Sequence, residues 1–428
     1  MLLRVMIAVG CIGLTAACGI PAAAKSETRW KIGEPIVTYW AGPGSGDFMA
    51  LDDRAAAQLA AGGWNLGWAS KPEDLDVYHR HGLRAMLVVG TPNIDDPDKA
   101  KALDALIERV KDHPSLYAYY VTDEPGAGSF AGLGKLVAFL RQRDPAHLPF
   151  INLYPTYANA AQLGVSDDAA ERAKVGYPTN FAGIGTDNGT VLRYREHLRQ
   201  FVDTVKPDLI SYDHYHFLKN GDGAQYFLNI AMIRQAAMEA GKPFMNIIQT
   251  CDSPAEGWRG PNENELRWLT YTSLAYGAQA IAHFRYDIGL WENPKDPTTP
   301  LPLYWALCRI NRDFTAIARK LQPLKSLGAY HCGTLPLGGQ PPPKGAPFLP
   351  SPASQEILIG YFGRSARRAT HAVVVNLDYR KPASTTIAAP GPMDVFDAPT
   401  ESWSGNSGGA RLHLDLPPGG GALVRLRR

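Results

Sequence analysis

The chain has 428 residues, of which 45% are hydrophobic and 20% charged, a composition typical of a globular protein rather than a disordered or membrane-embedded one. This length favours one large domain accompanied by a smaller one. The formal net charge is +2, and Lys and Arg are scattered without a dense basic stripe, which argues against nucleic acid as the main partner and favours a neutral ligand.

Residues 1–24 are predicted to be an export signal. Arg4 supplies a positive charge, an apolar run covers residues 5–17, and small residues precede Cys18. That run is too short for a transmembrane helix. Two outcomes stay open: lipidation of Cys18, which with Gly19 resembles the bacterial lipoprotein signal, or cleavage near residues 22–24. In both cases we expect an exported protein, periplasmic, secreted or lipid-anchored, that meets the membrane only through such an anchor.

Eight short apolar runs between residues 35 and 290 are predicted to be strands. Most are rich in Val, Ile, Tyr or Phe and end in polar or aromatic residues, as parallel strands buried on both faces do. The runs are Pro35–Trp40, Gly63–Trp68, Arg84–Val89, Tyr117–Thr122, Pro149–Tyr154, Asp208–Asp213, Pro243–Gln249 and Gln279–Tyr286.

The segments between these runs show apolar residues at helical spacing. They include residues 52–61, 97–111, 128–143, 190–205, 223–240 and 262–276. Eight strand–helix units predict an α/β fold, a (β/α)8 TIM barrel over residues 30–325, with extra length between strands five and six that includes a Gly-rich turn at 183–189. A doubly wound open sheet is the alternative, and it is less favoured because no Gly-x-Gly-x-x-Gly follows the first strand.

The composition changes after a last helix at 304–320. Pro and Gly cluster at 336–352, and five strand-like runs follow at 357–362, 371–377, 384–388, 393–396 and 422–426. We expect a small C-terminal all-β sandwich over residues 350–428 that supports the barrel. Cys251, Cys308 and Cys332 are odd in number and lack metal-type spacing, so neither a disulfide framework nor a zinc site is indicated.

The candidate functional residues lie at the ends of the predicted strands, because the active site of a TIM barrel is built at that face. These ends are rich in aromatic rings, amides and acids, which suit a sugar whose C–H faces stack on rings while its hydroxyls need hydrogen-bond partners. Phosphate and nucleotide signatures are absent, so a carbohydrate substrate and no cofactor are predicted. The expected substrate-binding residues are Tyr39, Trp40, Trp68, Asn152, Tyr154, Tyr212, His214, Tyr215, Asn246, Gln249, His283 and Tyr286.

The sharpest motif is Tyr119-Tyr120-Val121-Thr122-Asp123-Glu124-Pro125, which closes the fourth strand with two acids. Cleavage of a glycosidic bond needs one carboxylic acid to protonate the leaving oxygen and usually a second carboxylate across the bond. Neighbouring residues of a strand point to opposite sides, so we expect one of Asp123 and Glu124 to face the substrate. The other is expected to orient neighbouring groups or to tune the pKa of the first. The alternative is an ordinary solvated acidic turn.

This motif, the aromatic strand ends and the trailing β-domain resemble glycoside hydrolases of the retaining clan A type, including β-galactosidase-like enzymes. The resemblance implies that Glu124, at the end of strand four, is the acid/base. The clan's nucleophile is a Glu at the end of strand seven, where this sequence has Gln249. Asp213, Asp252 and Glu256 are the candidate replacements. Asp213 is favoured because Tyr212-Asp213 is similar to the strand-six pair of chitinase-like enzymes; its alternative role is to cap a turn.

Several residues allow two interpretations. His214 and His216, with Asp213, have the spacing of metal ligands, but hydrogen bonding in a polar cleft is favoured because no further ligand is evident and no metal is predicted. The large aromatics Trp64, Trp68 and Trp291 are either stacking platforms or packing residues.

Arg285, if buried, needs a carboxylate partner such as Asp287 or Glu292; a uronic-acid substrate is the alternative reason for an Arg at a strand end. We therefore expect a glycosidase that uses Glu124. The alternatives are a non-catalytic carbohydrate-binding lipoprotein, motivated by Gln249, and a metal-dependent barrel hydrolase.

Overall fold

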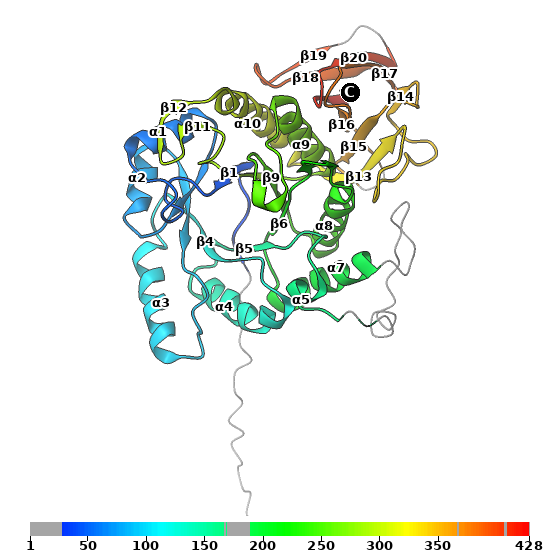
Figure 1. Cartoon of the computed structure of the whole chain (residues 1–428). Coiled ribbons are helices and arrows are strands. Elements are labelled where there is room, and N and C mark those ends of the chain that lie inside the picture. The colour runs from blue at the N-terminus through cyan, green and yellow to red at the C-terminus, as the bar shows by residue number, and fades with distance from the viewer. Residues whose placement is uncertain (1–27, 167, 169–188, 366–367, 406–408, 428) are drawn as a thin grey trace, which may run out of the picture.

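The computed structural model describes residues 28–166, 168, 189–365, 368–405 and 409–427 (Figure 1). The predicted export signal, including Cys18, and the predicted Gly-rich turn up to residue 188 lie outside these ranges. No helix among the described residues combines the length and the apolar character that crossing a membrane requires.

Eight parallel strands form the central sheet, which confirms the predicted barrel. They are β1 (Ile36–Trp40), β2 (Leu66–Ala69), β3 (Arg84–Val88), β4 (Leu116–Asp123), β5 (Leu148–Leu153), β6 (Ile210–His214), β9 (Phe244–Gln249) and β10 (Ala280–Phe284). Their spatial order, β1-β10-β9-β6-β5-β4-β3-β2, follows the chain around a ring. The Asn65 amide, just before β2, donates a hydrogen bond of 3.0 Å to the Val37 carbonyl of β1, so the ring closes and the open-sheet alternative is wrong.

The second strand begins three residues later than predicted. Gly63 has a positive φ of 80°, and the Trp64 amide donates to the Leu59 carbonyl, so these residues terminate the preceding helix instead of starting the strand.

Helices surround the sheet on its outer face (Figure 1). They are α1 (Asp53–Ala61), α2 (Asp74–Arg80), α3 (Pro97–Val110), α4 (Phe130–Arg143), α5 (Ala160–Leu163), α7 (Gly189–Gln200), α8 (Tyr226–Ala240), α9 (Glu263–Tyr276) and α10 (Pro302–Leu321). The helix predicted at 190–205 is α7 followed by a π-helical turn, η2 (Phe201–Val205). Short 3-10 turns occur at η1 (Ala127–Ser129) and η3 (Pro254–Glu256). The local sequence defines the start of α9, where Asn262 accepts from the Glu265 amide in a capping box.

Two antiparallel sheets form the C-terminal domain. The larger has the order β13-β15-β16-β21-β18-β19 and the smaller β14-β17-β20. The strands are β13 (Lys325–Cys332), β14 (Leu349–Ser351), β15 (Ile357–Gly363), β16 (His371–Asn376), β17 (Ala383–Ala388), β18 (Met393–Asp397), β19 (Ser402–Gly405), β20 (Arg411–Leu416) and β21 (Gly421–Leu426). All five predicted strands are present; β13, β14, β19 and β20 were not predicted. Two-stranded ribbons, β7 (Phe217–Leu218) with β8 (Gly221–Asp222) and β11 (Trp291–Asn293) with β12 (Asp296–Pro300), lie in barrel loops.

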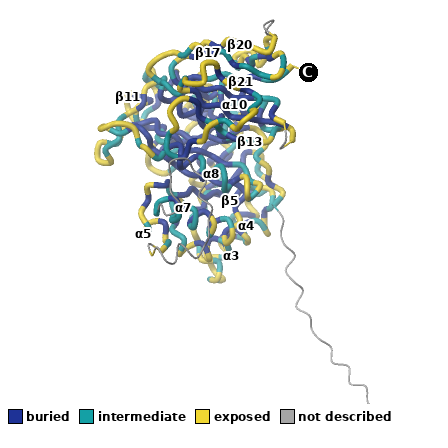
Figure 2. The backbone as a smooth tube through the Cα atoms, turned by 90° about the vertical axis from the view of Figure 1, so that its right-hand side faces the viewer, coloured by how far each residue is buried: buried dark blue, intermediate teal, exposed yellow. Residues whose placement is uncertain are grey.

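Figure 2 shows buried chain, in dark blue, through the interior of the molecule. The central strands of the larger C-terminal sheet have buried side chains on both faces. Leu358, Phe362 and Val373 belong to the core that includes the barrel, while Ile359 and Val374 pack into the core between the two sheets. This alternation follows from the two-residue period of a strand. Cys251, Cys308 and Cys332 are buried and unpaired by disulfides.

Gly360 of β15 permits a close approach of this sheet to the barrel helix α9. A Cβ on Gly360 would lie 2.0 Å from the Ala275 carbonyl oxygen. We therefore expect Gly360→Ala to destabilise the protein by about 1–3 kcal/mol through overpacking, measured as the midpoint of denaturant unfolding. Gly391→Ala is the control, because no atom lies within 4 Å of its Cβ position. Equal stability of both variants would contradict this packing account.

Candidate active site

A cavity of about 290 Å³ lies at the carboxyl ends of the barrel strands. Acids, aromatic rings and amides from strand ends β1, β4, β5, β6 and β10 and from the loop after β9 form its wall. The lining residues are Trp40, Asp123, Glu124, Asn152, Tyr154, Pro155, Tyr157, Ala158, Gln162, Asp213, Tyr215, Ile247, Glu256, Trp258 and Phe284.

Asp123 and Glu124 both line this cavity, so the expectation that they point to opposite sides is wrong. Asp123 is the last residue of β4, and Glu124 has left the strand with a left-handed φ of 45°. The alternation of side chains holds only within a regular strand. The Glu124 amide donates a 2.9 Å hydrogen bond to the Asn152 carbonyl, which fixes this turn against β5. A left-handed non-glycine residue is uncommon and concentrates at functional sites.

Asn152 joins two of the acids. Its Nδ2 donates to Asp123 Oδ1 and to Asp213 Oδ1, both at 3.0 Å. Ser211 Oγ in turn donates to Asn152 Oδ1 at 2.9 Å, which orients the amide. Because these residues end the neighbouring strands β4, β5 and β6, the barrel itself holds the carboxylates together.

Glu124 and Asp213 form a pair of acids in this cavity, and the pKa of each depends on the other. Burial and the negative charge of Asp123 raise the pKa of Glu124 to about 7, against the lowering effect of the hydrogen bond with Asp213. Burial, followed by the charges of Glu124 and Asp123, raises the pKa of Asp213 well above its usual range. Both groups therefore bind a proton more readily than an ordinary carboxyl group does.

Asp123 differs from this pair because it is exposed at the cavity mouth. Its Oδ1 nevertheless accepts a hydrogen bond from Asn152 inside the cavity. Partial desolvation there raises the pKa of the Asp123 carboxyl group, and the Asn152 hydrogen bond opposes that change. We treat Asp123 as the carboxylate most accessible to solvent in the hydrogen-bonded network.

Aromatic rings form the rest of the wall. Tyr215 lies against Trp258 with ring centroids 4.3 Å apart and against Phe284 at 4.8 Å. Trp40 packs on Trp68 and Tyr120, which do not line the cavity. Trp258 was not among the predicted site residues, because it comes from a loop whose sequence shows no periodic pattern.

The cavity gathers all three predicted catalytic residues and, of the predicted substrate-binding residues, Trp40, Asn152, Tyr154 and Tyr215. The other eight lie outside its lining and are buried: Tyr39, Trp68, Tyr212, His214, Asn246, Gln249, His283 and Tyr286. Strand side chains alternate between the barrel interior and the helix layer, so few positions at each strand end reach the mouth. Among the further candidates, Glu256 lines the cavity and Asp252 does not.

Hydrogen bonds show what several of these buried side chains do. Gln249 accepts from the Phe217 amide at 2.8 Å and donates to the Arg259 carbonyl at 2.8 Å, so it connects two loops. His214 Nδ1 contacts Asn229 Oδ1 at 2.9 Å. Trp68 Nε1 donates to the Tyr39 carbonyl.

The structure also shows where the residues with two predicted interpretations lie. No three His, Cys, Asp or Glu side chains group as metal ligands within the described ranges. Trp64 and Trp291 are buried packing residues, as is Trp68. Arg285 donates to Asp287, the partner expected for a partly buried Arg.

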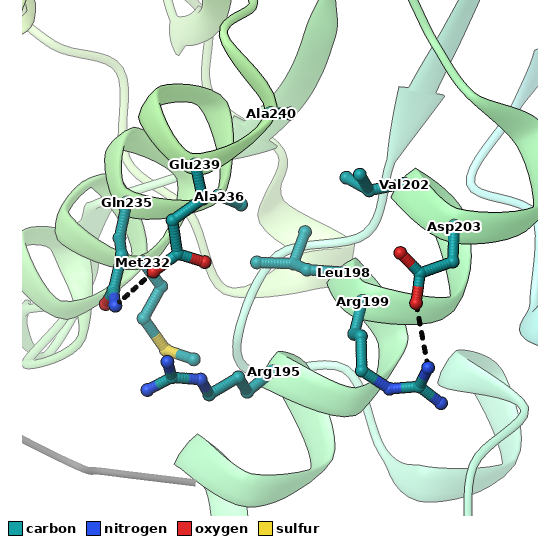
Figure 3. A pocket seen from close by; sticks show the side chains of 10 residues that line it. All are labelled: Arg195, Leu198, Arg199, Val202, Asp203, Met232, Gln235, Ala236, Glu239 and Ala240. Carbon is teal, nitrogen blue, oxygen red and sulfur yellow. Dashed lines mark hydrogen bonds and ion pairs between the residues drawn. The ribbon is translucent and has the colours of Figure 1, made fainter.

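A second pocket, of about 250 Å³, lies between α7, η2 and α8 on the outer helix layer (Figure 3). Its acids are engaged at the surface: Asp203 pairs with Arg199 at 2.8 Å, and Glu239 accepts from Gln235 at 2.8 Å. This pocket is formed by helices rather than strand ends, so we place the candidate active site at the mouth of the barrel.

No family model and no curated protein matches the sequence. The chain is similar in structure to α-galactosidase I from Mortierella vinacea, with a TM-score of 0.47 and 12% identity over 91% of this chain and 96% of that one. A noncanonic maltogenic α-amylase from Thermotoga neapolitana gives a TM-score of 0.48 and 7% identity over 92% of this chain and 99% of that one.

An endo-β-1,3-glucanase from Sorangium cellulosum gives a TM-score of 0.38 and 14% identity over 64% of this chain and 97% of that one. At TM-scores below 0.5, these similarities carry no argument about the activity of this chain. The barrel fold implied by the clan A resemblance is established by the strand order itself.

Proposed function

We propose that this protein is a glycoside hydrolase in which Glu124 is the general acid. The observation that carries the proposal is the meeting of Glu124, Asp123 and Asp213 in an aromatic-lined cavity at the mouth of the barrel. A general acid works best when its pKa lies near the working pH, and Glu124 has a pKa of about 7. Rings such as those of Trp258 and Tyr215 suit the apolar faces of a sugar.

Glu124 would protonate the glycosidic oxygen as the bond to the anomeric carbon breaks. The second carboxylate must be ionised to attack the anomeric carbon or to activate water. Asp213 is less suited to that role, because its pKa is raised well above the usual range and Asn152 holds it beside the acids that follow β4. We assign Asp213 to orienting the Glu124 carboxyl group and tuning its pKa.

Glu256 is our candidate for the second carboxylate. It lines the same cavity but comes from η3 after β9, which stands three places from β4 in the ring of strands. From there it would act on the anomeric carbon directly or on a water molecule. This assignment replaces Asp213 in that role.

The test is hydrolysis of a panel of α- and β-aryl glycosides and of plant and microbial polysaccharides, followed by chromatography of the products. We expect the full chain to release sugar from at least one member and Glu124→Gln to release far less from the same member. Binding of a glycan without turnover of any panel member at high protein concentration would instead support the non-catalytic carbohydrate-binding alternative.

A further inference from the structure

Among the described residues, the titratable side chains that line the candidate active site are acidic, with no basic residue among them. Four of its fifteen lining residues carry carboxyl groups, namely Asp123, Glu124, Asp213 and Glu256, and none of the lining residues among the described ranges is Lys, Arg or His. The described lining therefore offers acidic groups and no cationic group to a bound ligand.

Nearby cations are engaged outside the cavity. Arg259, next to Trp258 in sequence, contacts Glu265 at 2.7 Å and Asp222 at 3.5 Å. Arg285, which follows Phe284, is paired with Asp287 at 2.5 Å. Neither guanidinium belongs to the lining, so the carboxylates are not neutralised by these two residues.

The aromatic wall adds an independent preference. The aromatic lining residues include Trp40, Tyr154, Tyr215, Trp258 and Phe284. The rings of Tyr215, Trp258 and Phe284 form one cluster, with centroids 4.3, 4.8 and 6.2 Å apart. The face of an aromatic ring carries partial negative charge and attracts cations, most strongly in a partly desolvated site. Rings and carboxylates thus favour the same kind of ligand, a small cation with apolar faces.

We propose that the cavity binds a sugar unit bearing a free ammonium group, that is, a de-N-acetylated amino sugar within an oligo- or polysaccharide. This inference rests on the proposed function and specifies its substrate class. Asp123, which is exposed at the mouth and held by Asn152, is the carboxylate placed to pair with the ammonium group. A uronic-acid unit, the earlier alternative, would place one more negative charge among four carboxyls.

Binding is measured by calorimetry at pH 6 in Glu124→Gln protein, so that turnover does not interfere. The probes are oligomers of glucosamine and of galactosamine, each with its fully N-acetylated counterpart. We expect at least one amino oligomer to bind tenfold or more tightly than its N-acetylated counterpart, and this preference to weaken as salt is added.

The preference for the amino oligomer over its N-acetylated counterpart should fall severalfold when Asp123→Asn is added to the Glu124→Gln protein. It should stay unchanged when Asp47→Asn is added instead. Asp47 is the matched control, because it is an exposed carboxylate on the loop after β1 and is not a lining residue. Failure of both amino oligomers to bind, or equal binding of the amino and acetylated forms, would overturn the inference.

Turnover of glycans by the wild-type chain distinguishes failure of this inference from failure of the proposed function. Hydrolysis of neutral or acidic glycans with no binding of amino oligomers would overturn the substrate class and leave the glycosidase intact. Preferred binding of an amino oligomer without hydrolysis of any glycan would contradict the proposed glycosidase activity and support the amino-sugar ligand.

Discussion

Glu124→Gln is expected to lower kcat/KM on the natural glycoside by about 10²–10⁴-fold, the usual contribution of a positioned general acid. This corresponds to roughly 3–5 kcal/mol of transition-state stabilisation. Glutamine keeps the size of the side chain but cannot release a proton to the leaving oxygen. Substrate affinity should change little, because the aromatic wall and the Asn152 network remain in place.

Steady-state kinetics with a substrate found in the panel gives the measurement, and calorimetry gives the affinity. Glu292→Gln is the control, because Glu292 is exposed on β11 outside the cavity. Turnover of Glu124→Gln within a few fold of wild type would remove Glu124 from the chemistry.

Asp123→Asn is expected to move the alkaline limb of the pH–rate profile to lower pH. The Asp123 charge helps to raise the pKa of Glu124 to about 7, and a general acid is active only while protonated. In wild type, activity is therefore present below about pH 7 and is lost as the pH rises through that value. Without the Asp123 charge, Glu124 loses its proton at a lower pH. The rate at alkaline pH then falls roughly tenfold for each pH unit by which the alkaline limb moves.

The profile of kcat/KM between pH 4 and 9 measures this change. The loss should be larger at pH 8 than at pH 5, because at pH 5 Glu124 is protonated in both proteins and only a contribution of Asp123 to substrate binding is lost. A loss of equal size at every pH would mean that Asp123 positions the substrate and has no influence on the proton.

The barrel was predictable because buried parallel strands are continuous apolar runs and their helices carry an amphipathic repeat. β13 was missed for the opposite reason. Its sequence, Lys325-Ser326-Leu327-Gly328-Ala329-Tyr330-His331-Cys332, mixes polar and apolar residues, and its strand conformation depends on pairing with β15. Context of this kind outweighs local propensity in sheets.

The site was predictable in its chemistry and less so in its geometry. The acids after β4 and Asp213 of β6 meet because the fold places strand ends in one ring. The left-handed backbone at Glu124 is not signalled by the residue type, so the shared orientation of Asp123 and Glu124 could not be predicted. Most of the proposed sugar-binding residues proved to be buried instead, because sequence does not show which strand-end side chains turn toward the mouth.

The most direct test of Glu124 as the general acid is a leaving-group series. The kcat/KM of wild type and of Glu124→Gln is measured for aryl glycosides of one sugar whose phenols span a wide range of pKa. A good leaving group departs without protonation, so the two proteins should have similar rates on the most acidic phenols and diverge by about 10²-fold or more on the least acidic. The same rate ratio across the whole series would contradict proton donation by Glu124.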